Sequence, residues 1–246
     1  MVMSNIQSAL AAALPHTISL RQRLHTIPEL SKEEHKTADM IRSELRRLNI
    51  PFTAGVPGAP TATIGLAGDP GKPCIALRAD IDALPVQEET GQPYTSTHPG
   101  RMHACGHDGH TAALLGTAAI LSQLASSLPI CVKLIWQPAE ETGGGAQRLV
   151  EASVLDGRIG PKVQAIFAEI PHAGARYDCG GTGAGRIGTT SSFVSVGGAT
   201  PVPPVHTSSA KVRRQVFEVS KTRRPKAYPW AHPLTRGRSK PCSTAR

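Results

Sequence analysis

Apolar residues recur at the three- and four-residue spacing of a helix in four parts of the chain, separated by short apolar runs. This spacing lines one side of a helix with apolar residues, so each such segment is predicted to pack on a core. The predicted helices cover residues 5–25, the segment between Ser31 and Asn49, residues 109–125 and residues 145–153. In the first of them, Pro15 is expected to restart a turn.

The second predicted helix has the clearest boundaries. Ser31 and Glu34 have the spacing of a capping box, in which the two side chains bond to backbone amides of the first turn. The pattern predicts about five turns of helix, and Asn49 ends it. The apolar positions of this helix are Ala38, Ile41, Leu45 and Leu48.

Short apolar runs bounded by Gly, Pro or Asp predict strands. These strands cover residues 61–66, 74–79, 131–136 and 163–167, and a loop rich in Pro, Gly and Thr covers roughly residues 85–104. Because strands alternate with helices, the pattern predicts an α/β fold with a largely parallel sheet flanked by helices.

The alternating pattern ends near residue 172. In residues 173–246, Leu, Ile, Val and Phe together make 11 of 74 residues, about 15%, which is below the share with which a chain usually buries a core. We therefore divide the chain into a folded part, residues 1–172, and a poorly structured tail, residues 173–246. Residues 183–188 match the dinucleotide-binding pattern Gly-x-Gly-x-x-Gly, but they follow no predicted strand and open no predicted helix, so we reject that interpretation.

The basic charge of the chain belongs to this tail. Residues 1–172 carry 14 Lys and Arg against 16 Asp and Glu, a net charge of −2, while residues 173–246 carry 13 against 2, a net of +11; together these give +9. The tail contains no recognisable RNA- or DNA-binding motif. We therefore expect no specific nucleic-acid partner.

Cysteine usage and hydropathy indicate the compartment. The five cysteines are widely spaced and form no Cys-x-x-Cys pair, which argues against a disulfide framework and for a reducing environment. No signal-peptide pattern begins the sequence, and no apolar run is long enough to span a bilayer. We expect a cytoplasmic protein without a membrane partner. The cysteines are Cys74, Cys105, Cys131, Cys179 and Cys242.

Potential metal ligands are concentrated at the ends of the predicted strands. Residues 101–110 contain three His, one Cys and one Asp. Asp80 and Asp82 follow one strand, and Glu140 and Glu141 follow another. Because ligands of open α/β sheets bind beyond the carboxyl ends of the strands, these segments are expected to converge on one site. A thiolate, imidazoles and carboxylates together would bind zinc, manganese or nickel.

Each of these residues also has a structural interpretation. Cys105 alone would more often be a small buried hydrophobe. His107 and His110 could cap a helix or solvate its first turn, the Glu140–Glu141 pair could be a solvated helix start, and Asp80 and Asp82 could terminate a strand. Three segments that end at the same edge of a sheet, one of them with a Cys-x-His core, favour the metal site over these separate explanations.

The adjacent glutamates suggest a division of roles. One carboxylate can ligate the metal while its neighbour takes the proton from a metal-bound water. Asp82 would then orient a ligand or balance the charge of the site.

Four motifs, in this order, resemble the amidohydrolase/carboxypeptidase branch of the dinuclear metallopeptidases, which includes hippurate hydrolase and the indoleacetyl-amino-acid hydrolases. The resemblance runs from about Arg21 to Phe167. Its motifs are Arg-Gln-Arg-Leu-His at residues 21–25 with Pro-Glu-Leu at 28–30, Arg-Ala-Asp-Ile-Asp-Ala-Leu-Pro at 78–85, His-Ala-Cys-Gly-His-Asp-Gly-His at 103–110, and Gln-Pro-Ala-Glu-Glu-Thr-Gly-Gly-Gly at 137–145.

The resemblance implies roles for five residues. Cys105, His107 and Glu141 would be metal ligands, Glu140 the general base that activates water, and Asp82 the carboxylate that orients the site. The metal would be Mn²⁺ or Zn²⁺, with Ni²⁺ or Co²⁺ as alternatives. The implied reaction is hydrolysis of the amide bond of a small N-acyl amino acid by metal-activated water.

The sequence also departs from the family pattern. The family places a His ligand shortly after the strand that ends near Phe167, and this sequence has Ile170 there. His172, two residues on, could substitute only if the loop is rearranged. The lid domain of the family, through which it often forms homodimers, and a last His ligand are not recognisable. The alternative hypothesis is therefore a truncated or frame-shifted, non-catalytic remnant that binds about one divalent ion or fewer per chain.

Overall fold

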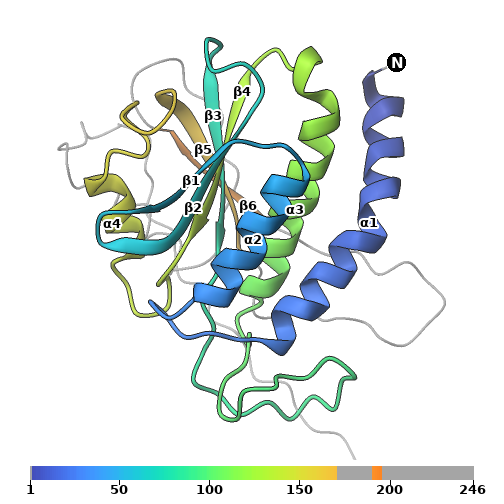
Figure 1. Cartoon of the computed structure of the whole chain (residues 1–246), viewed down its shortest axis with the longest axis vertical. Coiled ribbons are helices and arrows are strands. Elements are labelled where there is room, and N and C mark those ends of the chain that lie inside the picture. Colours follow the sequence, from blue (N-terminus) through green and yellow to red (C-terminus); the bar gives the residue numbers. More distant parts are fainter. Residues whose placement is uncertain (1, 171–189, 196–246) are drawn as a thin grey trace, which may run out of the picture.

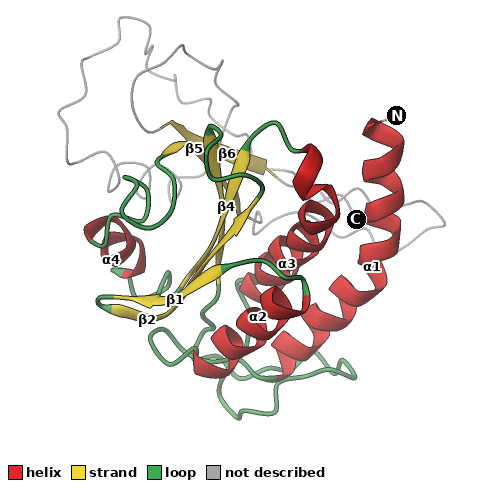
Figure 2. Ribbon diagram, turned by 45° about the horizontal axis from the view of Figure 1, so that its top comes forward, coloured by secondary structure: helices red, strands yellow, loops and turns green. Residues whose placement is uncertain are grey.

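The computed structural model describes residues 2–170 and 190–195. Within these residues helices cover both faces of the sheet (Figure 1, Figure 2). The α/β fold is therefore confirmed. The predicted tail lies outside the described residues, apart from one short strand.

Three helices cover the first face of the sheet: α1 (Val2–Thr26), α2 (His35–Arg47) and α3 (His107–Leu124). Helix α1 continues through Pro15 without interruption. Helix α2 ends as predicted, because Asn49 adopts a left-handed φ of 55° and turns the chain out of the helix. A short 3-10 helix, η1 (Ala125–Ser127), follows α3, and α4 (Gly145–Glu151) lies on the second face.

Six strands form one sheet in the order β1-β2-β4-β3-β5-β6. Their bounds are β1 (Phe52–Val56), β2 (Ala59–Ala67), β3 (Cys74–Asp80), β4 (Cys131–Gln137), β5 (Val163–Ile170) and β6 (Thr190–Ser195). The predicted parallel pairing occurs at the centre, where β3 pairs with β4 and with β5. The outer pairs β1–β2, β2–β4 and β5–β6 are antiparallel, so the sheet is mixed rather than largely parallel.

Alternate residues of the central strands supply two separate cores. In β4, Val132, Leu134 and Trp136 face the three-helix layer and pack with Leu24 and Leu115 among others. Cys131 and Ile135 face the other way and pack in a second cluster with residues such as Leu149 and Val163. Every residue of β4 is buried. Burial on both faces explains why β4 is apolar at nearly every position, with Lys133 and Gln137 as the exceptions.

The predicted capping box at the start of α2 is wrong. Glu34 makes no side-chain bond to an amide of the first turn, and Ser31 instead donates to Asp82, with 2.6 Å between Oγ and Oδ2. The cap comes from Glu29, whose carboxylate accepts bonds from the amides of Lys36 and Thr37 at 3.1 and 2.9 Å. Ser31 and Glu34 are thus available for contacts with distant loops. None of the described helices is long and apolar enough to cross a membrane.

Candidate metal centre

The predicted site residues meet at the carboxyl ends of the two central parallel strands. Asp80 ends β3 and pairs in register with Gln137, which ends β4. Asp82 lies two residues beyond β3, and the Glu140–Glu141 pair lies three and four residues beyond β4. His107 is the first residue of α3, whose N-terminus points at this edge.

The structure brings together the three residues predicted to bind metal. One ligand atom each from Cys105, His107 and Glu141 lies within 4.8 Å of the other two. His107 is buried, and Cys105 and Glu141 are partly buried. A thiolate, an imidazole and a carboxylate at this separation suit a borderline divalent cation, so the donor set fits the implied metal.

The orientation of the His107 ring follows from one hydrogen bond. Its Nδ1 lies 2.8 Å from the backbone oxygen of Asp82, and a carbonyl oxygen only accepts, so Nδ1 carries the proton. The opposite nitrogen, Nε2, faces the carboxylates of Glu141 and Glu140, at 3.7 and 4.0 Å. A ligating His is commonly held in this way, with the backbone fixing its tautomer and the other nitrogen free for metal.

The site is strongly electronegative. Burial lowers the pKa of His107, but hydrogen bonds to Asp82 and Cys105 and the charges of Asp80 and Asp82 outweigh it and raise that pKa to about 11. Burial and the charge of Asp80 raise the pKa of Glu140. Carboxylates gathered around one imidazole in this way attract a cation.

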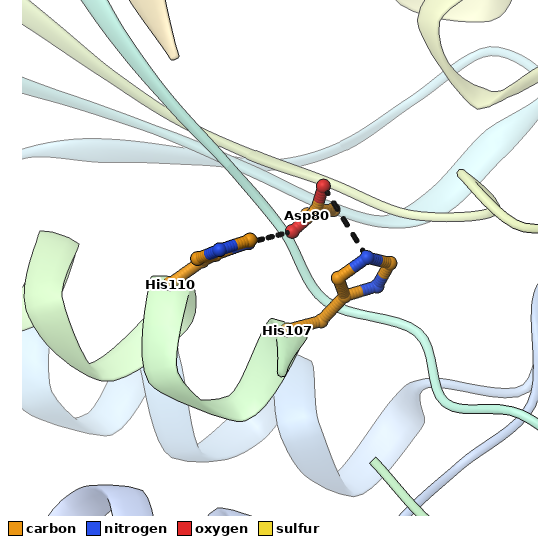
Figure 3. A group of neighbouring side chains, drawn as sticks. All are labelled: Asp80, His107 and His110. Carbon is orange, nitrogen blue, oxygen red and sulfur yellow. Dashed lines mark hydrogen bonds and ion pairs between the residues drawn. The ribbon is translucent and has the colours of Figure 1, made fainter. Parts of the chain in front are cut away.

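A second group of possible ligands overlaps the first. Figure 3 shows Asp80, His107 and His110, whose ligand atoms also lie within 4.8 Å of one another. Both oxygens of Asp80 are already bonded, one to Nδ1 of His110 at 2.6 Å and the other to Nη1 of Arg78 at 2.7 Å. Since Asp80 is engaged by two cationic or donor groups, we regard Cys105, His107 and Glu141 as the better ligand set.

Asp82 connects two segments of the site. Its Oδ2 accepts bonds from Ser31 Oγ at 2.6 Å and from the amide of Glu141 at 2.9 Å. Its backbone oxygen holds His107, as described above. Asp82 thus contacts two of the predicted ligands: its backbone oxygen accepts from the His107 ring, and its carboxylate accepts from the amide of Glu141.

A buried polar cluster next to the site was not predicted. His25 of α1 lies between Asp108 and Glu88, with Nδ1 2.8 Å from Asp108 and Nε2 3.1 Å from Glu88. Arg21 also pairs with Asp108, at 2.8 Å. His110, which the sequence offered either as one of the clustered potential ligands or as a helix cap, is buried and bonded to Asp80. His172 lies outside the described residues.

Comparison with known proteins gives consistent results. Residues 76–235 match the peptidase family M20/M25/M40. N-acetyl-L-cysteine deacetylase of Bacillus subtilis is 49% identical over 145 residues, which are 57% of this chain and 33% of that protein. IAA-amino acid hydrolase ILR1-like 4 of Arabidopsis thaliana is 44% identical over 150 residues, 61% of this chain and 32% of that protein. The chain thus spans about a third of the length of these relatives.

A solved structure shares the fold and much of the sequence. It is a dinuclear metal-binding peptidase of the M20 family from Bacillus subtilis, with a TM-score of 0.59 and 45% sequence identity. The similarity covers 64% of this chain and 43% of that one. The family match continues to residue 235, beyond the resemblance noted in the sequence, which runs to about Phe167.

Proposed function

Because this chain belongs to the peptidase family M20/M25/M40, we propose that it is a metal-dependent hydrolase that cleaves the amide bond of N-acyl amino acids. The observation that carries the proposal is the convergence of Cys105, His107 and Glu141 within 4.8 Å. These residues come from a loop, a helix start and the turn after β4, and they are up to 36 positions apart in the sequence. If Cys105, His107 and Glu141 each had only a local structural role, nothing would require their side chains to lie together.

Cys105, His107 and Glu141 would hold the cation, with Mn²⁺ or Zn²⁺ as the preferred ions. A cation bound there would polarise the amide carbonyl and lower the pKa of a nearby water. His107 would present Nε2, because Nδ1 is committed to the Asp82 carbonyl. Asp82 would keep the ring and the Glu141 backbone in place through its two contacts.

Glu140 would act as the general base. Its carboxylate lies at the site, 4.0 Å from Nε2 of His107, and burial together with the charge of Asp80 raises its pKa. A raised pKa makes a carboxylate a stronger proton acceptor. Glu140 would take a proton from the attacking water and deliver it to the nitrogen that leaves as the amino group of the product.

The substrate class rests on the relatives. One is a deacetylase of N-acetyl-L-cysteine and another hydrolyses IAA-amino acids, so each acts on an amino acid whose nitrogen carries an acyl group. We extend this class to the present chain. A metal-binding chain without turnover is the second candidate, favoured by Ile170 at the place where the family resemblance implies a His ligand.

Metal content and hydrolysis test the proposal on the full chain. We expect release of amino acid from N-acetyl-cysteine or a benzoyl-amino acid in the presence of Mn²⁺ or Zn²⁺, and its loss in Glu140→Gln with the metal content unchanged. Glu151→Gln, in the exposed ion pair with Arg148 on α4, is the matched control. About one cation per chain with no turnover would instead support the second candidate, and no cation bound at all would exclude both.

A further inference from the structure

Glu34 is a fully buried acidic residue that the proposed reaction does not use. It immediately precedes α2, and none of its surface is exposed. Among the described residues it forms no ion pair. A buried carboxyl without a cationic partner is costly unless its oxygens accept hydrogen bonds. Its contacts therefore indicate why an acid stands at this position.

Each oxygen of Glu34 accepts one hydrogen bond from a distant segment. Oε2 accepts from the hydroxyl of Thr61 in β2 at 2.8 Å. Oε1 accepts from the backbone amide of Ala139 at 2.9 Å, although the two residues are 105 positions apart. Glu34 thus ties the start of α2 to the loop that carries Glu140 and Glu141.

Ala139 needs such support because its backbone is strained. Its φ is +53°, in the left-handed region that residues other than Gly, Asn and Asp rarely adopt. The same residue accepts a bond from the amide of Gly145 at 3.4 Å, which closes the loop on itself. The left-handed step at Ala139 turns the chain at the end of β4 and so sets the direction of the next residue, Glu140.

The amides on both sides of Glu140 are held by buried carboxylates. Glu34 binds the amide of Ala139, and Asp82 binds the amide of Glu141, each at 2.9 Å. Ser31 donates to Asp82 from the same segment that contains Glu34. The segment 31–34 therefore fixes the backbone on either side of the proposed general base.

We propose that Glu34 is a positioning residue of the site: by accepting the Ala139 amide it holds the left-handed turn that places Glu140 and Glu141 at the metal centre. That Glu34 supports catalysis rests on the proposed function, whereas that Glu34 holds the turn at Ala139 rests on the backbone geometry alone. Two measurements test these two statements separately, and the one that tests the turn needs no metal.

The test compares two variants of Glu34 in the full chain. Glu34→Met keeps the length of the side chain but removes the acceptor, whereas Glu34→Gln keeps an amide oxygen for Ala139. Thr61→Val removes only the other hydrogen bond of Glu34 and is the control for disturbance of its burial. Hydrogen exchange of the amides of residues 139–141 reports the turn, and Co²⁺ titration, followed by the thiolate-to-metal absorption of Cys105, reports the ligand set.

In Glu34→Met we expect faster exchange at residues 139–141, unchanged exchange in β1 and α4, and Co²⁺ affinity reduced by about tenfold or more, as for other residues that orient metal ligands. Glu34→Gln and Thr61→Val should stay close to the unaltered chain. If Glu34→Met does not fold, hydrogen exchange and Co²⁺ affinity are measured in the double variant Glu34→Met with Ala139→Gly, since Gly adopts this φ without strain.

Three results would overturn the proposal. They are unchanged exchange at residues 139–141 in Glu34→Met, a loss of protection spread evenly over the whole fold, and an equal effect of Thr61→Val. If the unaltered chain binds no Co²⁺, the proposed ligand set fails, and exchange at residues 139–141 still decides whether Glu34 holds the turn.

Discussion

The imidazole of His25, near the end of α1, lies 2.8 Å from the carboxylate of Asp108, in the first turn of α3, and both side chains are buried. Asp108 directly follows His107, so this contact fixes the end of α3 that supplies a proposed metal ligand. Hydrogen bonds to charged groups contribute about 1.5–3 kcal/mol each. The two nitrogens of His25 can be tested separately, because Asn replaces the Nδ1 position and Gln the Nε2 position.

We expect His25→Gln, which loses the bond to Asp108 and keeps the one to Glu88, to weaken cation binding more than His25→Asn, which does the reverse. Arg21 still pairs with Asp108 in both variants, so each is expected to fold. Titration with Mn²⁺ or Co²⁺ measures the difference. Equal affinities in the two variants would show that the Asp108 contact does not position His107.

Stability should depend on pH through His25. The hydrogen bond to Asp108 raises its pKa above 6.5, although burial opposes this, and Glu88 adds to the rise. Because folding raises the pKa, protonated His25 contributes its full stabilisation of the fold below pH 6.5. This contribution is lost as the pH rises through the pKa of the folded state. The urea midpoint of the unaltered chain should therefore exceed that of His25→Gln most at about pH 6, with a gap that narrows at alkaline pH. A gap that widens with pH would contradict this assignment.

Cation binding should release a proton from His107. Burial lowers the pKa of this residue, but bonds to Asp82 and Cys105 and the nearby carboxylates raise it to about 11. In the metal-free chain the ring is therefore protonated at neutral pH, whereas a metal ligand must be neutral. Affinity should rise about tenfold per pH unit for one displaced proton.

Calorimetry in two buffers of different ionisation enthalpy measures this release. We expect about one proton per cation from His107 near pH 7, and less in His107→Gln, whereas His16→Gln, whose ring is about half exposed, should match the unaltered chain. Binding heats that are the same in both buffers would exclude His107 as a ligand.

The order of helices and strands could be predicted because each element carries its own apolar period. The hairpin partner β1 could not, since Phe52–Val56 is short and mostly outside the core and so lacks a clear pattern. The antiparallel outer pairs were missed for a related reason. Whether two strands run parallel or antiparallel depends on which strands pair. Strand β2 pairs with β1 and β4, and its apolar run does not indicate which strands will be its neighbours.

The convergence of the candidate site could be predicted from strand ends alone. Asp80 and Gln137 are in register at the ends of β3 and β4, so the residues that follow them are brought to one edge. The supporting contacts could not be predicted, because they join residues far apart. Glu34 has the local spacing of a capping box, but its partners, Thr61 and Ala139, lie 27 and 105 positions away.

Gly145 has no room for a side chain. A Cβ at this position would lie 1.7 Å from the backbone oxygen of Pro138, and backbone atoms cannot give way cheaply. We expect Gly145→Ala to force apart the loop that carries Glu140 and Glu141, to destabilise the chain by about 1–3 kcal/mol and to weaken cation binding. Denaturant unfolding and cation titration measure these effects.

Gly109 provides the matched control for this substitution. It lies inside α3, next to the site in sequence, and a Cβ there would meet nothing within 4 Å. Ala is favoured over Gly in a helix, so Gly109→Ala should leave the stability unchanged or raise it by up to about 1 kcal/mol. Similar behaviour of the two variants would mean that the loop at Gly145 adapts without cost.

Lys133 should matter for stability and not for the metal centre. Its side chain is fully buried in β4, and its ammonium group donates to the backbone oxygens of Val154, Ile159 and Pro161 at 2.5, 2.6 and 2.8 Å. These oxygens belong to the turn that leads from α4 to β5. Lys133 pairs with Ala76, four residues before the end of β3, so it lies well back from the strand ends that form the site.

We expect Lys133→Met to lower the free energy of unfolding by about 3 kcal/mol or more, because three backbone oxygens lose a charged donor at once. Lys162→Met, at an exposed position in the same turn, should change it by no more than about 0.5 kcal/mol. Denaturant unfolding of the two variants measures the difference. Cation affinity, measured where Lys133→Met remains folded, should equal that of the unaltered chain, since the residue reaches the second face of the sheet and not the site. A loss of affinity in this variant would mean that the turn after α4 also supports the metal centre.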